Sequence, residues 1–111
     1  MAYEELPEFS RELKRLRKKY RTLNDDLDGL KRVLASLKMK NGGKHWNCLH
    51  RGETCSVYKI RLACRYLRAT TMRVIYAQHT EPARIVFIEL YYKGEKENEN
   101  AERIKQYLSD L

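Results

Sequence analysis

Cationic side chains alternate with apolar ones in two short segments of the chain. Lys59 and Arg61 lie on one side of the segment Val57–Leu62. Arg73 likewise alternates with apolar residues in the segment Met72–Tyr76. Side chains two residues apart in a strand share one face of the sheet, so neighbouring strands would bring these cations together. Lys and Arg stabilise the negative charge of phosphates. The spacing therefore predicts a surface that grips a nucleic-acid backbone.

A tyrosine pair and a lysine end the next apolar segment, Arg84–Tyr92. Consecutive strand residues point to opposite faces, so at most one of Tyr91 and Tyr92 would join the cations. Lys93 would close the far edge of this surface. Two simpler interpretations stay open. The cations could serve only solubility or the docking of a partner protein, and aromatic residues in strands often only pack.

Glu89 is a carboxylate within an otherwise apolar strand. Burial there would raise its pKa and suit it to act as a general base. Pairing with a neighbouring arginine is the commoner arrangement for such a residue.

Metal-ligand residue types gather in one segment, as His45, Cys48, His50 and Cys55. Their spacing matches no common zinc pattern, so no metal site is predicted. Trp46 is expected to anchor this segment to the core, although it could also stack on an RNA base. The remaining histidine, His79, lies beside a predicted turn and is expected to be solvated.

The N-terminal helix, about Pro7 to Tyr20, has an unusually basic face. Its apolar stripe is Phe9, Leu13, Leu16 and Tyr20, at helical spacing. A solvated surface is the simplest interpretation of the other face, but its charge density also suits contact with RNA phosphates. The residues predicted to bind RNA are Arg11, Lys14, Arg15, Lys18 and Lys19.

Periodicity predicts the remaining elements. A second helix follows Thr22 directly, so the first two helices should form an αα-hairpin. The predicted later segments are a loop over Gly43–Thr54, three strands over Cys55–Leu62, Met72–Tyr76 and Arg84–Tyr92, a turn over Gln78–Ala83, a charged loop over Lys93–Asn100, and a helix ending at Leu108.

Composition narrows the class of protein. The 111 residues are expected to form one domain, 1–111, and the net charge of +8 favours nucleic acid as partner, with an acidic protein segment second. The chain has no apolar run of bilayer length, and its acidic start, which lacks an apolar core, is not expected to act as a signal peptide. Three cysteines, an odd number, predict free thiols in a cytoplasmic protein.

Three short motifs in order resemble the RelE/ParE superfamily of toxins from type II toxin–antitoxin pairs. They are Tyr58-Lys59-Ile60-Arg61, Arg73-Val74-Ile75-Tyr76, and the strand and charged tail from Ile88 to Asn98. The helical opening, Pro7–Tyr20, is also similar to that of the family. The resemblance implies an α+β fold with a short first strand at Ala2–Glu5, a helical hairpin on a twisted antiparallel sheet, and a C-terminal helix.

The RelE-like branch, which the resemblance favours, implies an endoribonuclease that cuts mRNA on the ribosome, inhibits translation and is neutralised by a cognate antitoxin. Lys59, Arg61 and Arg73 match the family's basic positions around the scissile phosphate, and Tyr91 and Lys93 would complete the catalytic set. No cofactor is implied. A ParE-like toxin would instead inhibit DNA gyrase without cutting RNA, and a degenerate member would only bind its partner.

Overall fold

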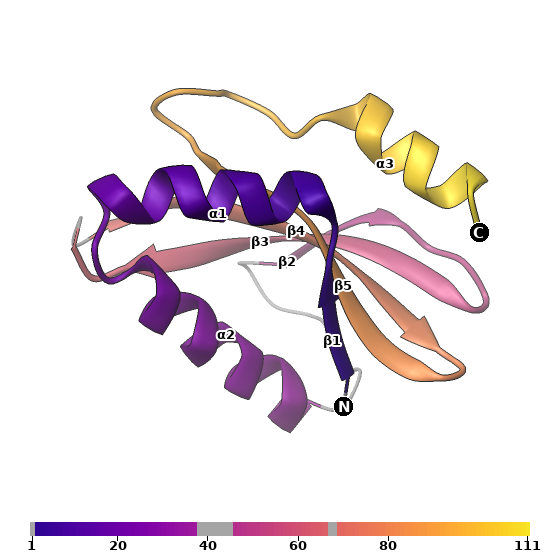
Figure 1. Cartoon of the computed structure of the whole chain (residues 1–111). Helices are drawn as coiled ribbons and strands as arrows, with labels where there is room; N and C mark the ends of the chain where they lie inside the picture. The colour runs from indigo at the N-terminus through magenta and orange to yellow at the C-terminus, as the bar shows by residue number, and fades with distance from the viewer. Residues whose placement is uncertain (1, 38–45, 67–68) are drawn as a thin grey trace.

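Helices pack on one β-sheet in a mixed α+β arrangement, which confirms the predicted class (Figure 1). The computed structural model describes residues 2–37, 46–66 and 69–111. The elements are β1 (Ala2–Glu5), α1 (Pro7–Lys19), α2 (Leu23–Leu37), β2 (Trp46–His50), β3 (Cys55–Cys64), β4 (Ala69–Thr80), β5 (Ala83–Tyr92) and α3 (Ala101–Ser109).

The strands form one five-stranded sheet in the order β1-β5-β4-β3-β2. Strand β1 runs parallel to β5, and the other neighbours are antiparallel, so the sheet is mixed and the expectation of a wholly antiparallel sheet is wrong at this edge. Helices α1 and α2 cover one face, and α3 covers part of the other (Figure 1). The sheet is therefore the middle layer, and its two faces have separate apolar cores.

Apolar spacing explains why α1 and α2 lie where they do. Phe9 and Leu16 of α1 are buried, and the Phe9 ring stacks on Phe87 with centroids 5.3 Å apart. Pro7 suits the first helical turn, where its missing N–H is no loss, and the basic last turn of α1 complements the helix dipole. In the part of the chain that the structure describes, neither helix is long and apolar enough to cross a membrane, and α3 is not either.

Two boundaries differ from the sequence-based expectation. Residues Trp46–His50, predicted as loop, form the edge strand β2, while residues 43–45 of that prediction lie outside the described part. Edge strands carry exposed polar side chains, so their alternation is weak. The predicted anchoring role of Trp46 is confirmed, because its indole Nε1 donates a 2.8 Å hydrogen bond to the Tyr76 hydroxyl. Strand β4 also extends to Thr80.

A β-bulge at Ile88 changes which way the end of β5 faces. Ile75 pairs with Glu89 but Tyr76 pairs with Phe87, so Ile88 is an extra residue in β5. Such a bulge breaks the strict alternation of faces. As a result Ile88 and Glu89 both point to the α3 side, and Tyr91 follows them there.

Candidate functional site

Two rows of side chains cross three strands on the α3 side of the sheet. Arg61 of β3 lies opposite Arg73 of β4, which lies opposite Tyr91 of β5. One step along, Lys59 lies opposite Ile75, which lies opposite Glu89. Directly opposed side chains on one face are about 5 Å apart at Cβ. We call Lys59, Arg61, Arg73 and Tyr91 the cationic patch.

The two arginines of the patch have contrasting surroundings. Arg61 is exposed, whereas Arg73 is 8% exposed and donates from Nη1 to the backbone oxygen of Met72 at 3.1 Å. Burial, and then the like charge of Arg61, lower the pKa of Arg73. Like charges placed directly opposite each other repel. An anion bound between these guanidinium groups would relieve that repulsion.

Tyr91 is the tyrosine of the pair that joins the patch. Its side chain is 4% exposed, and burial, followed by the charges of Glu99 and Glu89, raises its pKa to about 12. At neutral pH its phenol therefore keeps its proton and can donate it. Tyr92 points to the other face, where its ring lies 5.4 Å from that of Tyr20. The prediction that the two rings face opposite ways is confirmed.

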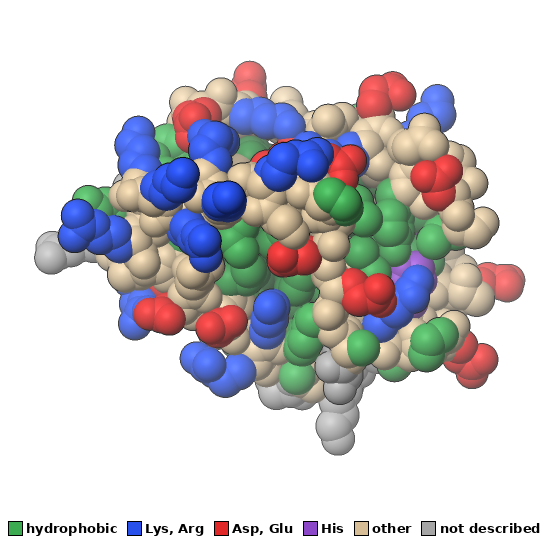
Figure 2. All heavy atoms as spheres, viewed as in Figure 1, with side chains coloured by type: hydrophobic (Ala, Val, Ile, Leu, Met, Phe, Trp, Pro, Cys, Tyr) green, Lys and Arg blue, Asp and Glu red, His purple; other side chains and the backbone are tan. Residues whose placement is uncertain are grey.

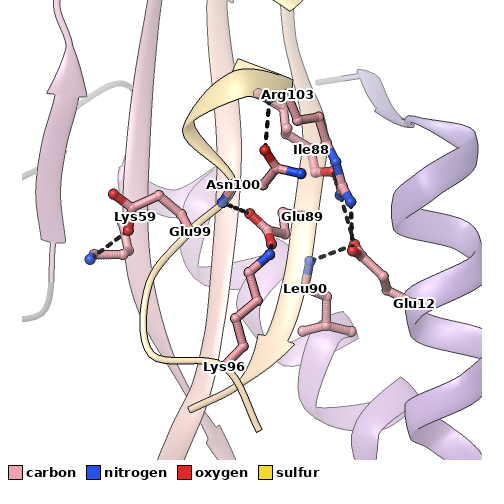
Figure 3. Close-up of polar contacts among 9 residues, drawn as sticks. All are labelled: Glu12, Lys59, Ile88, Glu89, Leu90, Lys96, Glu99, Asn100 and Arg103. Atoms are coloured by element: carbon pink, nitrogen blue, oxygen red, sulfur yellow. Dashed lines mark hydrogen bonds and ion pairs between the residues drawn. The ribbon is translucent and has the colours of Figure 1, made fainter. Parts of the chain in front are cut away.

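Glu89 is fully buried and its carboxylate is engaged by the segment that follows β5 (Figure 3). It pairs with the Lys96 ammonium, and Oε1 accepts a 2.7 Å hydrogen bond from the backbone N–H of Asn100. The expected arginine partner is therefore wrong, because a lysine from a neighbouring loop takes that place. The same Lys96 ammonium lies 5.6 Å from the centroid of the Tyr91 ring.

A second carboxylate of this segment reaches the patch itself. Lys59 donates a 2.8 Å hydrogen bond to Glu99, and both side chains are only about one-fifth exposed (Figure 3). Burial raises the pKa of Glu99, but the hydrogen bond and charge of Lys59 outweigh burial and leave that pKa below its usual value. Glu99 is therefore ionised at neutral pH and neutralises one cation of the patch.

An ion pair between layers fixes α3 and the segment before it. Arg103 of α3 binds the Glu12 carboxylate at 2.8 and 2.9 Å and donates to the backbone oxygen of Ile88 at 2.9 Å. Glu12 also accepts the backbone N–H of Leu90 at 3.1 Å. Strand β1 pairs with β5 only as far as Phe87, so this ion pair satisfies backbone groups where that pairing has ended.

The other predicted site residues do not join the patch. Lys93 is exposed in the turn after β5, and Lys96 is the late lysine whose side chain reaches Tyr91. The predicted RNA-binding residues lie on α1, which packs on the opposite face of the sheet, and Figure 2 shows basic side chains gathered over this helix. All are exposed: Arg11, Lys14, Arg15, Lys18 and Lys19.

His79 is buried, so its predicted exposure to solvent is wrong. Its Nε2 lies 2.5 Å from the Tyr107 hydroxyl of α3 and 3.8 Å from the Cys55 sulfur. Burial lowers the pKa of His79, and the charge of Arg84 acts in the same direction. Tyr107, which covers His79, lies 28 positions later in the chain, so the local sequence pattern could not reveal this burial.

A groove of about 710 Å³ between α2 and β3 is the alternative place for a ligand. Its wall includes Asp25, Asp26 and Asp28 beside Arg32, Arg61 and Arg65. The three carboxylates offset the charge of the three arginines, and Arg65 already pairs with Asp25 and Asp26, so the groove is less suited to phosphate than the patch. Within the described residues, no group of three or more His, Cys, Asp or Glu side chains could hold a metal ion. The three cysteines are free thiols.

Sequence reasoning missed Lys96 and Glu99 as neighbours of the patch. The charged stretch after β5, residues 93–100, was predicted only as a loop. Its acidic residues in a strongly basic chain were the available signal, since they suggest an internal partner for the cations.

Comparison with known proteins bears on the fold. Neither a scan against protein-family models nor a search of curated proteins found a match. Among solved structures, the chain is similar to a chain in the archaeal RelE–RelB complex from Pyrococcus horikoshii OT3, with a TM-score of 0.61 and 15% sequence identity. The match covers 84% of this chain and 94% of that chain. A likeness at this identity shows the fold, which is RelE-like.

Proposed function

We propose that this chain is the toxin of a type II toxin–antitoxin pair, that it cuts mRNA on the ribosome in the cytoplasm, and that a cognate protein antitoxin neutralises it. The RelE-like fold supports the class of protein. The net charge of +8 supports a nucleic-acid target. The observation that carries the proposal is the row Arg61–Arg73–Tyr91, which places two cations beside a protonated phenol.

This row supplies two of the requirements of RNA cleavage. The 2′-oxygen attacks the phosphorus, the bond to the 5′-oxygen breaks, and a cyclic phosphate and a 5′-hydroxyl result. Arg61 and Arg73 stabilise the charge that develops on the phosphorus oxygens. Tyr91 donates its proton to the leaving 5′-oxygen. Glu89 is the nearest candidate for the general base, but Lys96 engages its carboxylate. The proton of the 2′-hydroxyl is therefore taken by a base outside the patch.

One observation favours a second candidate, a ParE-like toxin that binds gyrase and cuts no RNA. Arg73 and Tyr91 are almost fully buried. A protein that acts only by binding has no need to open this row to a substrate. The two candidates differ in what stops first in the cell, which is translation for the nuclease and replication for the gyrase inhibitor.

The test uses controlled expression of three chains: wild type, Arg61→Ala and Arg51→Ala. Arg61 is exposed, so its removal leaves the core intact, and Arg51 is an exposed arginine after β2 that controls for lost charge. We expect wild type and Arg51→Ala to arrest translation first, with toeprints showing mRNA cut on ribosomes. In Arg61→Ala the cleavage should fall about 100-fold or more. Replication arrest without cut mRNA would establish the second candidate and reject the first.

A further inference from the structure

The segment between β5 and α3, residues 93–100, lies against the cationic patch and is held at both ends. At its start, the backbone N–H groups of Glu95 and Lys96 donate to the Tyr92 oxygen at 3.0 and 3.1 Å. At its end, Asn100 caps α3 by accepting the Arg103 N–H at 3.0 Å. The ion pair between Arg103 and Glu12 then fastens α3 to α1.

Between these anchors, two side chains of the segment point at the patch (Figure 3). Glu99 accepts the Lys59 hydrogen bond, and Lys96 lies over the Tyr91 ring while it pairs with Glu89. Other residues of the segment are exposed, among them Glu97 and Asn98. The segment therefore fills the space in front of Lys59 and Tyr91, which an RNA phosphate would need.

We propose that residues 93–100 form an autoinhibitory strap, in which the Glu99 carboxylate holds the Lys59 ammonium in place of an RNA phosphate. The inference rests on the proposed RNA function of the patch. A carboxylate and a phosphate both accept charge-assisted hydrogen bonds from an ammonium group. RNA can bind Lys59 only after Glu99 has left it. The strap therefore raises the RNA concentration that binding requires.

The competition is uneven because Glu99 belongs to the same chain. A tethered group acts at an effective concentration in the millimolar range. A free RNA phosphate at lower concentration therefore loses to Glu99 unless further contacts support it. A large assembly that presents RNA at several points would supply those contacts, whereas a short free RNA would not. Short RNA should accordingly bind the wild-type chain weakly.

The experiment compares the full-length wild type with Glu99→Gln and Glu102→Gln. Both substitutions remove one negative charge, but Glu102 is exposed on α3, whereas Glu99 contacts Lys59. Affinity for a short single-stranded RNA is measured by fluorescence anisotropy at fixed salt. Acetylation of the Lys59 amine, quantified by mass spectrometry, reports on the strap without RNA. Circular dichroism checks that each variant is folded.

We expect Glu99→Gln to bind the RNA about five- to tenfold more tightly than Glu102→Gln, and its Lys59 to be acetylated faster. Unchanged acetylation of Lys59 in Glu99→Gln would overturn the strap. Equal gains in affinity in the two variants would overturn it too, since the effect would be one of net charge. If acetylation rises while no variant binds RNA, the strap stands and the proposed RNA function fails.

Discussion

The outer face of α1 and the cationic patch are both rich in positive charge, yet they differ in almost every physical respect. The α1 cations stand in water, and Arg15 pairs with Glu95 at 3.2 Å while both side chains are about half exposed. In the patch, Arg73 is buried and Lys59 is half-buried on a sheet, beside carboxylates and a phenol, while Arg61 reaches the solvent. The outer face of α1 has only solvated charges, whereas the patch has charges that other side chains surround and orient.

This difference separates affinity from chemistry. Exposed charges interact weakly and are screened by salt, so α1 can attract a polyanion but cannot orient it. Charges on a rigid sheet, shielded from water, act more strongly and keep their directions. We therefore expect substitutions in the patch to change rates, and substitutions on α1 to change binding and its salt dependence.

The largest effect is expected from Tyr91→Phe. The substitution keeps the buried ring and removes only the hydroxyl, whose pKa burial raises to about 12. Loss of a general acid lowers rates about 100-fold or more, so mRNA cleavage on ribosomes should fall by that factor while RNA affinity stays unchanged. Toeprinting under single-turnover conditions measures the rate.

Tyr92→Phe is the matched control, because it removes the neighbouring hydroxyl on the other face of the sheet. It should cleave at the wild-type rate. If Tyr91→Phe also cleaves at that rate, the phenol is not the proton donor, and the patch would act through its cations alone.

A smaller effect, on stability, is expected from Glu12→Ala. The change leaves Arg103 without its carboxylate and the Leu90 N–H without its acceptor, and the Glu12 and Arg103 side chains are less than one-fifth exposed. Breaking a buried ion pair costs more than removing an exposed one, so we expect a loss of about 2 kcal/mol in the free energy of unfolding. Urea denaturation measures it.

Glu95→Ala provides the contrast, since it breaks the exposed pair with Arg15. That loss should be about 0.5 kcal/mol or less. Equal losses in the two variants would mean that the pair between Arg103 and Glu12 does not hold α3, and the strap would then lack its anchor.

Alternation made part of the candidate site predictable. A period of two predicts that Lys59 and Arg61 share one face of the sheet. In the structure Arg73 of β4 lies directly opposite Arg61, so all three side chains share that face. The catalytic roles of these residues stay predictions. The choice between Tyr91 and Tyr92 was not predictable, because the bulge at Ile88 resets the alternation and leaves no mark in local pattern.

Contacts between residues far apart in the sequence explain the other features that sequence analysis missed. His79 has a polar neighbourhood in the sequence, yet Tyr107 of α3 shields it from water. Glu99 reaches Lys59 across 40 positions of sequence. Such contacts depend on where a loop and a terminal helix pack against the sheet, and periodicity carries no information on that. The overall RelE-like fold, by contrast, follows from the order of elements and their apolar faces.

The smallest effect is expected on α1. Lys14 and Lys18 are exposed and one helical turn apart, so Lys14→Gln with Lys18→Gln removes two neighbouring charges without disturbing the core. If both bind phosphates, affinity for single-stranded RNA should fall a few-fold and the slope of log affinity against log salt should flatten by about 1.4. Cleavage at saturating RNA should not change. Arg51→Gln with Lys105→Gln removes the same charge from exposed positions elsewhere and should leave the slope as it is. An unchanged slope in the α1 variant would make that face a solvated surface, and all phosphate recognition would then fall to the sheet.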